Sequence, residues 1–244
     1  MGRREWGVVA LADDRLVRVA AALAASDDGS GPLISRLCPA AVELAAVSGA
    51  VLSILSEGRY SATVCVSDDV AAQLEELHVA LGDGPGLDAH RSGQPVVEAD
   101  LADASPDRWP SFTQSALEAG ARAVFAFPLR IGGIRVGILD LYRATPGPLS
   151  ATGFGDAVTL AHLAAQAVVA LSAQAPPDGV PGVLTDAALR AEVHQATGMI
   201  SVQLDVGIEE AFVRLQAHAY ATGRRIGEVG DDVVARRLRF DERT

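Results

Sequence analysis

The 244-residue sequence contains no lysine, and all 20 of its basic residues are arginines. They are outnumbered by 31 acidic residues, which gives a formal net charge of −11. Such an acidic balance favours solubility and disfavours non-specific binding to polyanions such as nucleic acids. Because alanine is also abundant, we attribute the lack of lysine to GC-rich codon usage. An arginine taken alone is therefore a weak functional signal in this chain.

Cysteine is scarce, since Cys38 and Cys65 are the only two. Both lie in apolar patterns, where cysteine usually behaves as a small buried hydrophobe. We therefore expect neither a disulfide framework nor a zinc site. The sequence also has no run of about 18 apolar residues, which predicts no membrane-spanning helix. The first residues lack a long hydrophobic stretch, and we expect a cytoplasmic protein.

One segment rich in proline and glycine divides the chain. Gln174–Val183 holds three prolines and two glycines, which end any helix that enters it. We predict a helical extension over 1–32, a first domain over 33–173, a linker over 174–184 and a second domain over 185–244. The second domain is nearly neutral, because residues 183–244 hold 8 arginines and 10 acidic residues.

The first domain alternates between helical and strand patterns. Periodicity predicts helices over 13–25, 33–47, 70–81, 111–119 and 150–173, and strands over 50–56, 60–67, 95–98, 124–130 and 134–142. Gly132 and Gly133 separate the last two strands and can supply the positive φ angles of a hairpin turn. Helices around an antiparallel sheet make an α+β domain.

Two segments of this domain resemble a GAF domain, with the resemblance extending over about 33–171. They are AAQLEELHVALGDGPGLDAHRSGQPVVEADL (71–101) and GARAVFAFPLRIGGIRVGILDLYRATPGPLS (120–150), in the form common in actinobacterial GAF–ANTAR regulators. The resemblance implies an antiparallel sheet flanked by helices that senses a signal, with a possible small-molecule ligand, or mediates dimerisation. The family's glycine-rich turn commonly reads GPC, but position 86 is Gly86, so thiol chemistry at this turn lacks its nucleophile.

The sequence gives little support to an enzyme, a metal or a cofactor. No two histidines have the spacing of metal ligands, and no carboxylates accompany a nucleophile; the histidines are His78, His90, His162, His194 and His218. His90 could serve as a ligand in a sensory pocket, but we favour a solvated or hydrogen-bonded histidine near a helix end. Phe125 and Phe127 face one side of their strand, where we expect them to form core.

Three further helical patterns follow the linker, from Leu189 to Arg239. Each has one apolar stripe, and the stripes comprise Leu189, Val193, Ala196 and Ile200; Ile208, Ala211, Phe212, Leu215 and Ala219; and Ile226, Val229 and Val233. The stretch LRAEVHQATGMISVQLDVGIEEAFVRLQAHAYATGRRIGEVGDDVVARRLR resembles the ANTAR domain, an all-α three-helix bundle that binds RNA hairpins. Thr197 stands where many members of that family have lysine, which removes one charge that could reach a phosphate.

The resemblance implies a signal-responsive transcription antitermination regulator. Its ANTAR domain would bind hairpin loops in leader transcripts and prevent terminator formation, with the protein acting as a homodimer. The residues that we expect to contact RNA are Arg190, His194, Thr197, Gly198, Arg214, His218, Arg224 and Arg225, and Tyr220 offers a ring for stacking. The alternative is a GAF sensory protein whose C-terminal helical domain binds a protein partner rather than RNA.

Overall fold

The structure is a computed structural model that describes residues 4–26, 33–56, 59–105, 107–174, 187–224 and 226–241. Nearly all of the expected linker over 174–184 lies outside these residues. The helices in the order of the chain are α1 (Arg4–Ala25), the 3-10 turn η1 (Leu33–Arg36), α2 (Leu37–Ala45), α3 (Asp69–Leu81), α4 (Pro85–Ser92), α5 (Pro110–Glu118), α6 (Ala151–Gln174), α7 (Ala187–Leu204), α8 (Ile208–Thr222) and α9 (Ile226–Val234).

One antiparallel sheet of five strands lies at the centre, in the order β2-β1-β5-β4-β3. Its strands are β1 (Gly49–Ser56), β2 (Arg59–Val66), β3 (Val96–Glu98), β4 (Ala123–Ile131) and β5 (Ile134–Arg143). The expected hairpin joins β4 to β5, with Ile131 paired to Ile134 across the turn. Gly132 has φ +58°, the left-handed conformation that the turn requires. All five predicted strands are present, with ends that differ by one or two residues.

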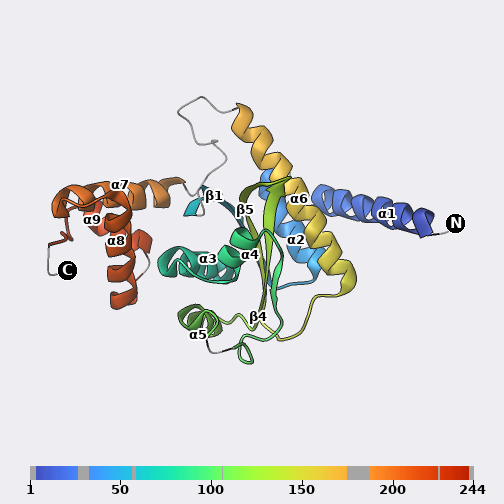
Figure 1. Ribbon diagram of the computed structural model, residues 1–244, viewed down its shortest axis with the longest axis horizontal. Coiled ribbons are helices and arrows are strands. Elements are labelled where there is room, and N and C mark those ends of the chain that lie inside the picture. Colours follow the sequence, from blue (N-terminus) through green and yellow to red (C-terminus); the bar gives the residue numbers. More distant parts are fainter. Residues whose placement is uncertain are drawn as a thin grey trace.

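Helices cover both faces of the sheet (Figure 1), with α2 and α6 on one face and α3, α4 and α5 on the other. Alternate side chains of a strand point to opposite faces. On β4, Phe125 and Phe127 face the α2–α6 layer, where they are 0% and 1% exposed. Val124, between Ala123 and Phe125, packs instead with Leu74 and Phe112 under α3 and α5. The expectation that the two phenylalanines form core is confirmed.

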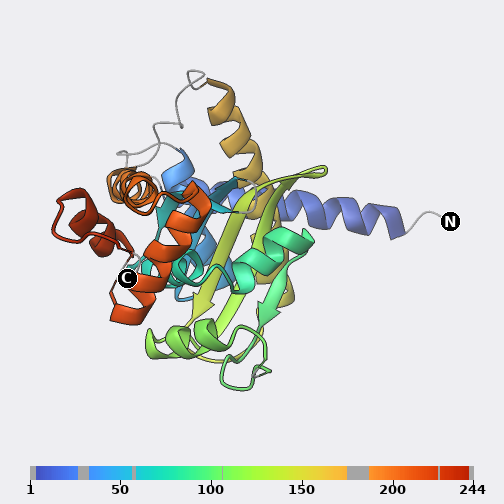
Figure 2. The same cartoon turned by 60° about the vertical axis from the view of Figure 1, so that its left-hand side comes forward.

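The N-terminal helix α1 packs against α2 and α6 and projects beyond them (Figure 2). Asp156 of α6 fixes it there, because the Arg18 guanidinium donates to both carboxylate oxygens, with the shorter bond at 2.8 Å. Residues Ala151–Ala170 of α6 are apolar and long enough to cross a membrane by length and composition alone. In this fold α6 contacts β4, β5 and α2, and Leu160, Ala164 and Val168 are buried in the core, so α6 is a core helix of the domain.

The glycine-rich segment before Leu87 was expected to be a turn, but helix α4 begins within it. Gly82 does end α3, with φ +62°, but a new helix begins at Pro85. Proline suits this first helical position because its missing N–H would have no partner within the helix, and its fixed φ is already helical. The segment Gly-Asp-Gly-Pro-Gly (82–86) therefore contains both the end of α3 and the start of α4.

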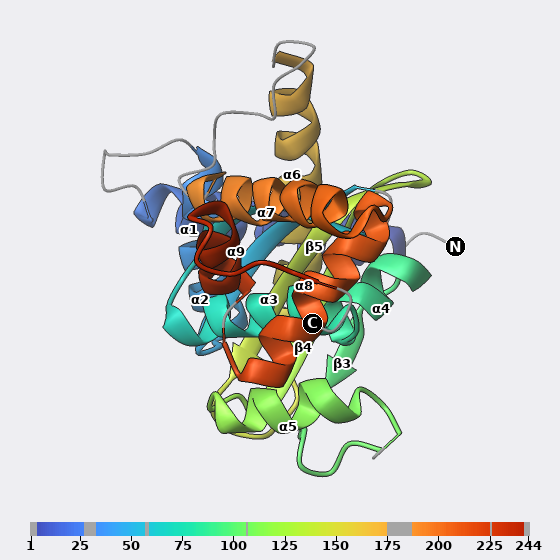
Figure 3. The same ribbon diagram turned by 90° about the vertical axis from the view of Figure 1, so that its left-hand side faces the viewer.

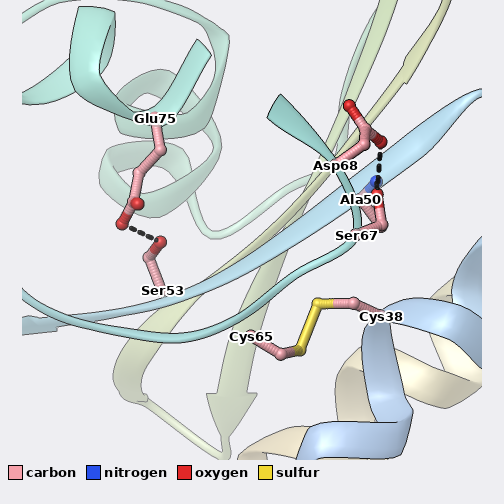
Figure 4. The surroundings of a disulfide bond; sticks show 7 residues. All are labelled: Cys38, Ala50, Ser53, Cys65, Ser67, Asp68 and Glu75. Carbon is pink, nitrogen blue, oxygen red and sulfur yellow. Dashed lines mark hydrogen bonds between the residues drawn. A yellow bond between two sulfur atoms is a disulfide. The ribbon is translucent and has the colours of Figure 1, made fainter. Parts of the chain in front are cut away.

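Cys38 and Cys65 form a disulfide, which corrects the expectation that the cysteines are only small buried hydrophobes. Cys38 lies on α2 and is fully buried, while Cys65 lies on β2, 27 residues later. Their Cα atoms are 6.0 Å apart, a separation that a disulfide spans. Figure 4 shows the bond on the α2 side of β1 and β2, opposite Glu75 of α3. The apolar patterns place both cysteines in one core but give no sign that they meet there.

The C-terminal helices α7, α8 and α9 form a bundle with its own core. Val193, Ala196 and Ile200 of α7 pack with Leu215 of α8 and Val229 of α9. The bundle lies against α3 (Figure 3), where Val79 packs on its core and the Gln216 amide donates to the Val79 carbonyl oxygen. Bundles of this size are marginally stable alone, and docking on α3 buries further apolar surface.

We predict that the disulfide stabilises the folded chain. Closing a loop of this length restricts the unfolded chain, and its loss lowers the free energy of unfolding by about 2–4 kcal/mol. Urea unfolding of the oxidised wild type should thus have a higher midpoint than that of the double variant Cys38→Ala/Cys65→Ala. A thiol reductant should lower the wild-type midpoint and leave the variant unchanged. Equal midpoints for oxidised and reduced wild type would contradict the prediction.

Candidate functional site

A buried group of polar side chains lies between the sheet and α3. Glu75 of α3 is 6% exposed and accepts hydrogen bonds from two hydroxyl groups on the strands. Ser53 Oγ of β1 lies 2.7 Å from Glu75 Oε1, and Thr63 Oγ1 of β2 lies 2.6 Å from the same oxygen. Figure 4 shows Glu75 reaching down from α3 to Ser53. These bonds compensate the carboxylate for its loss of water.

His78 lies one turn after Glu75 on the same face of α3 and is 2% exposed. Its ring stacks on Phe112 of α5, with centroids 4.6 Å apart. Its Nε2 accepts a long hydrogen bond, 3.4 Å, from the Gly86 N–H, so the ring proton of a neutral histidine lies on Nδ1. Burial lowers the pKa of His78 to about 3, and the ring is therefore uncharged at neutral pH.

Asp140 of β5 faces His78 across the same space. It is 9% exposed, and neither of its carboxyl oxygens has a hydrogen-bond partner. His78 Nδ1 lies 3.7 Å from Asp140 Oδ2. Burial first, and then the charge of Glu75, raise the pKa of Asp140 well above its usual value. Both causes favour the protonated, neutral carboxyl.

Two glycines let α4 approach these side chains closely. A Cβ atom at Gly86 would lie 2.7 Å from Asp140 Oδ2 and 2.6 Å from Ile138 Cδ1. A Cβ at Gly84 would lie 2.4 Å from the His78 ring, and Gly84 also has φ +128°. The space that a side chain at position 86 would occupy is taken by the Asp140 carboxyl. The absence of cysteine at this position thus has a structural reason in this chain.

The side chains enclose a cavity of about 10 Å³, which has room for roughly one water molecule. Its polar lining comes from His78, Asp140 and Tyr142, and the Tyr142 hydroxyl donates to Asp68 Oδ1 at 3.0 Å. The rest of its wall is mainly apolar and comprises Val51, Ala71, Leu74, Pro85, Phe112, Val124 and Leu141. A polar-lined space of this size suits a buried water molecule rather than a drug-sized ligand.

The other histidines of this domain lie outside the cavity. His90 is in the last turn of α4, as a histidine near a helix end was expected to be, but it is 7% exposed rather than solvated. Desolvation lowers its pKa, and a backbone hydrogen bond with Gly137 opposes the shift. His162 is exposed on α6. Within the described residues, no group of three or more His, Cys, Asp or Glu side chains is arranged to hold a metal ion.

Two of the expected RNA contacts, Thr197 and Gly198, lie on α7. Thr197 is 3% exposed, and its hydroxyl donates to the Val193 carbonyl oxygen at 2.7 Å, so it is part of the bundle core rather than of a polar surface. Gly198 has open space where a Cβ would be, so no second backbone approaches it. A threonine whose hydroxyl bonds to a carbonyl of its own helix can be buried without an unsatisfied polar group.

The remaining candidates are partly described. On α8, Arg214 is exposed and pairs with Glu210 at 3.2 Å, while His218 is half-buried and packs edge-on against Phe240. Tyr220 is 59% exposed. Arg224 lies 2.7 Å from Asp232, which also binds Arg237. Arg225 and the side chains of Arg190 and His194 lie outside the described part of the chain.

The sequence reasoning missed the buried cluster. Ser53, Glu75, His78 and Asp140 come from three elements that are far apart in the sequence and meet only in the fold. One local signal was available, because Asp140 interrupts the apolar run Gly-Ile-Leu-Asp-Leu-Tyr of β5. A lone acidic residue inside a buried strand is costly and points to a role.

Comparison with known proteins agrees with the architecture. The sequence model of the GAF domain family matches residues 33–171 of this chain. A GAF domain from a phosphoenolpyruvate-protein phosphotransferase of Coxiella burnetii has a TM-score of 0.50 and 16% identity, and the alignment covers 66% of this chain and 95% of that one. The GAF domain of the Acinetobacter phosphotransferase has a TM-score of 0.49 and 12% identity, with 67% and 97% covered. A search of curated proteins found no match to the chain.

We predict that His78 makes the fold sensitive to acid. Its pKa is lower in the folded chain than in the unfolded one, so its contribution to stability is complete above about pH 6.5 and is lost as the pH falls toward 3. Between pH 6.5 and pH 5 this loss amounts to about 2 kcal/mol. His78→Gln should remove this part of the pH dependence in urea unfolding. His162→Gln, at an exposed histidine, is the control and should keep it; identical pH profiles for both variants would refute the assignment.

Proposed function

This chain belongs to the GAF domain family. From the resemblance of its C-terminal stretch to the ANTAR domain, we propose that it is a signal-responsive transcription antitermination regulator. Residues 33–171 form its GAF sensory domain. In the proposal, the bundle of α7, α8 and α9 is the RNA-binding output, and it holds hairpins of a nascent transcript so that a terminator stem cannot form. The protein then acts in the cytoplasm as a homodimer and shifts an RNA folding equilibrium without catalysis.

The observation that carries the proposal is a ridge of α8 formed by Arg214, which is exposed, and His218, which is half-buried. Arg214 and His218 lie one turn apart on α8, and each is two positions from Gln216, the residue that bonds to α3. Two positions correspond to about 200° around a helix, so the Arg214–His218 ridge points away from α3. Basic side chains on such a ridge can reach the phosphates and bases of an RNA loop.

Helix α3 supports a route for the signal. Its inner face carries Glu75 and His78 of the buried cluster, and Val79, the next residue, belongs to the contact with the bundle. Any movement of α3 caused by a ligand in the cavity therefore changes the support under α8. This contact links sensor and output directly.

A protein partner is the second candidate, and exposed apolar side chains favour it. Val202 on α7 is 83% exposed, and Ile208 and Val213 on α8 are 58% and 56% exposed. Such side chains suit a protein interface better than a phosphate backbone. The net charge of −2 over residues 183–244 also gives weak electrostatic attraction to RNA. The RNA experiment below distinguishes the two candidates.

We predict that the full chain binds RNA with two adjacent hairpins and that Arg214→Gln weakens this binding. Loss of one phosphate contact should lower the affinity several-fold and reduce the slope of log K against log salt by about 1. Fluorescence polarisation with labelled RNA at several salt concentrations measures both. Arg91→Gln, at an exposed arginine of α4, is the matched control and should bind like wild type. Absence of binding at low salt would exclude the RNA reading and favour the protein partner.

We also predict that the Gln216 hydrogen bond holds the bundle on α3. Gln216→Ala removes the only side-chain donor described for the Val79 carbonyl and should cost about 1 kcal/mol of docking. Peptides of α8 should then exchange their amide hydrogens faster, while those of β4 and β5 stay protected. Gln166→Ala on the exposed face of α6 is the control. Unchanged exchange in α8 would show that the contact does not restrain the bundle.

A further inference from the structure

We propose that a pocket between α6 and the end of β4 binds a small carboxylic acid with an apolar body, held by Arg130. The pocket has a volume of about 320 Å³, within the range of roughly 300–1,000 Å³ that small-molecule sites occupy. It shares no lining residue with the cavity at His78 and Asp140. The inference goes beyond the proposed function and does not depend on it.

The pocket lies where β4 loses its neighbouring strand. Because β3 pairs only with residues Val124–Ala126, the outer edge of β4 from Phe127 onward has no partner strand in the part of the chain that the structure describes. Pro128 suits such an edge, since proline has no N–H to donate to a further strand. The turn Gly93–Pro95 before β3 lines one side of the opening and α6 lines the other. Helix α6 and β4 pack together in the core, so these walls are fixed by the fold.

The charge at this pocket is positive, although the chain carries a net charge of −11. Arg130 is part of the lining, and Arg135 of β5 is its partner across the hairpin. Among the described residues, neither guanidinium group forms an ion pair with a carboxylate. No lining residue is acidic, and Asp156 and Glu98, the acidic residues nearest to the lining in the sequence, are paired with other arginines. Like charges opposite each other on neighbouring strands are destabilising, and a bound anion would offset their repulsion.

The guanidinium group of Arg130 is held in place beside the pocket. Its Nη1 donates to the Gly93 carbonyl oxygen at 2.8 Å, and Gly93 also lines the pocket. A guanidinium group has five N–H donors in one plane, so further donors remain for a ligand. Their fork matches the two oxygens of a carboxylate better than the single charge of a lysine does. Gln94 and His162, the other polar side chains of the lining, also carry N–H donors.

The apolar part of the lining selects the body of the ligand. Phe127 and Pro128 form this part on β4, and Val158 and Ala161 form it on α6. Val158 is 42% exposed, on a helix whose other face lies in the core. A ligand with an apolar body would remove this surface from water, which is favourable. An anion without such a body would leave it uncovered, and an uncharged or cationic molecule would not pair with Arg130.

The test is an NMR titration of the full chain with benzoate, followed at the backbone amides of Gly93, Gln94 and His162. We expect saturable shifts with a Kd on the order of 1 mM. Benzamide and benzylammonium keep the ring but lack the negative charge, whereas acetate and inorganic phosphate lack the ring. Each should bind about tenfold more weakly than benzoate, or weaker still. Equal binding of any of the four would overturn the proposal, as would benzoate shifts that do not saturate or that lie only elsewhere in the domain.

Variants of two lining residues separate the charge from the apolar wall. Arg130→Gln should weaken benzoate binding about tenfold or more, and Arg130→Lys, which keeps the charge without the fork, should lie between it and wild type. Val158→Phe enlarges an exposed side chain at the wall and should block benzoate while leaving Arg130 in place. Arg239→Gln, at an exposed arginine after α9, is the matched control and should bind like wild type. Wild-type affinity in a folded Arg130→Gln or Val158→Phe would refute the assignment.

Discussion

The arrangement of the sensory domain depends on the burial of ionisable side chains beneath α3. Glu75, His78 and Asp140 all lie between this helix and the sheet, where water is largely excluded. Two of them, His78 and Asp140, are driven by desolvation toward their neutral forms, and Glu75 is compensated by hydroxyl groups of β1 and β2. An apolar replacement set would pack this space at lower cost. The polar groups there thus cost stability rather than add to it.

The same constraint determines the glycine-rich segment before α4. Gly84 and Gly86 are needed because the His78 ring and the Asp140 carboxyl occupy the volume that side chains at these positions would fill. Helix α4 can then begin at Pro85 directly above the cluster. A cysteine at position 86 and a carboxyl at position 140 compete for one volume. Glycine rather than cysteine at position 86 is therefore a consequence of the buried Asp140 carboxyl.

Local sequence patterns predicted the helices and strands well, but they did not predict which distant residues contact one another in the fold. Alternation and helical periodicity located all five strands and most helices. This works because an element that buries one face has apolar residues at regular intervals along a short stretch of sequence. The helix α4 was missed because Gly-Pro-Gly also reads as a turn. The Cys38–Cys65 disulfide and the Asp140–His78 pair join residues that are distant in sequence, and no periodicity encodes such pairings. Thr197 shows the opposite error, a polar residue that satisfies its hydroxyl within its own helix and is buried.

The bundle and the sensory domain meet mainly through the packing of α8 on α3, with a smaller contact between α7 and β2. Helix α3 presents His78 to the cavity and Val79 to the bundle, so both contacts respond to a single displacement of the helix. A ligand changes the output only by the difference in its affinity for the two positions of α3. A very small molecule makes few contacts, and its leverage is therefore modest. Coupling of about 1–3 kcal/mol is sufficient for a regulatory response. The contact described between α3 and α8, with the Gln216 hydrogen bond and the packing of Val79, is where such coupling would act.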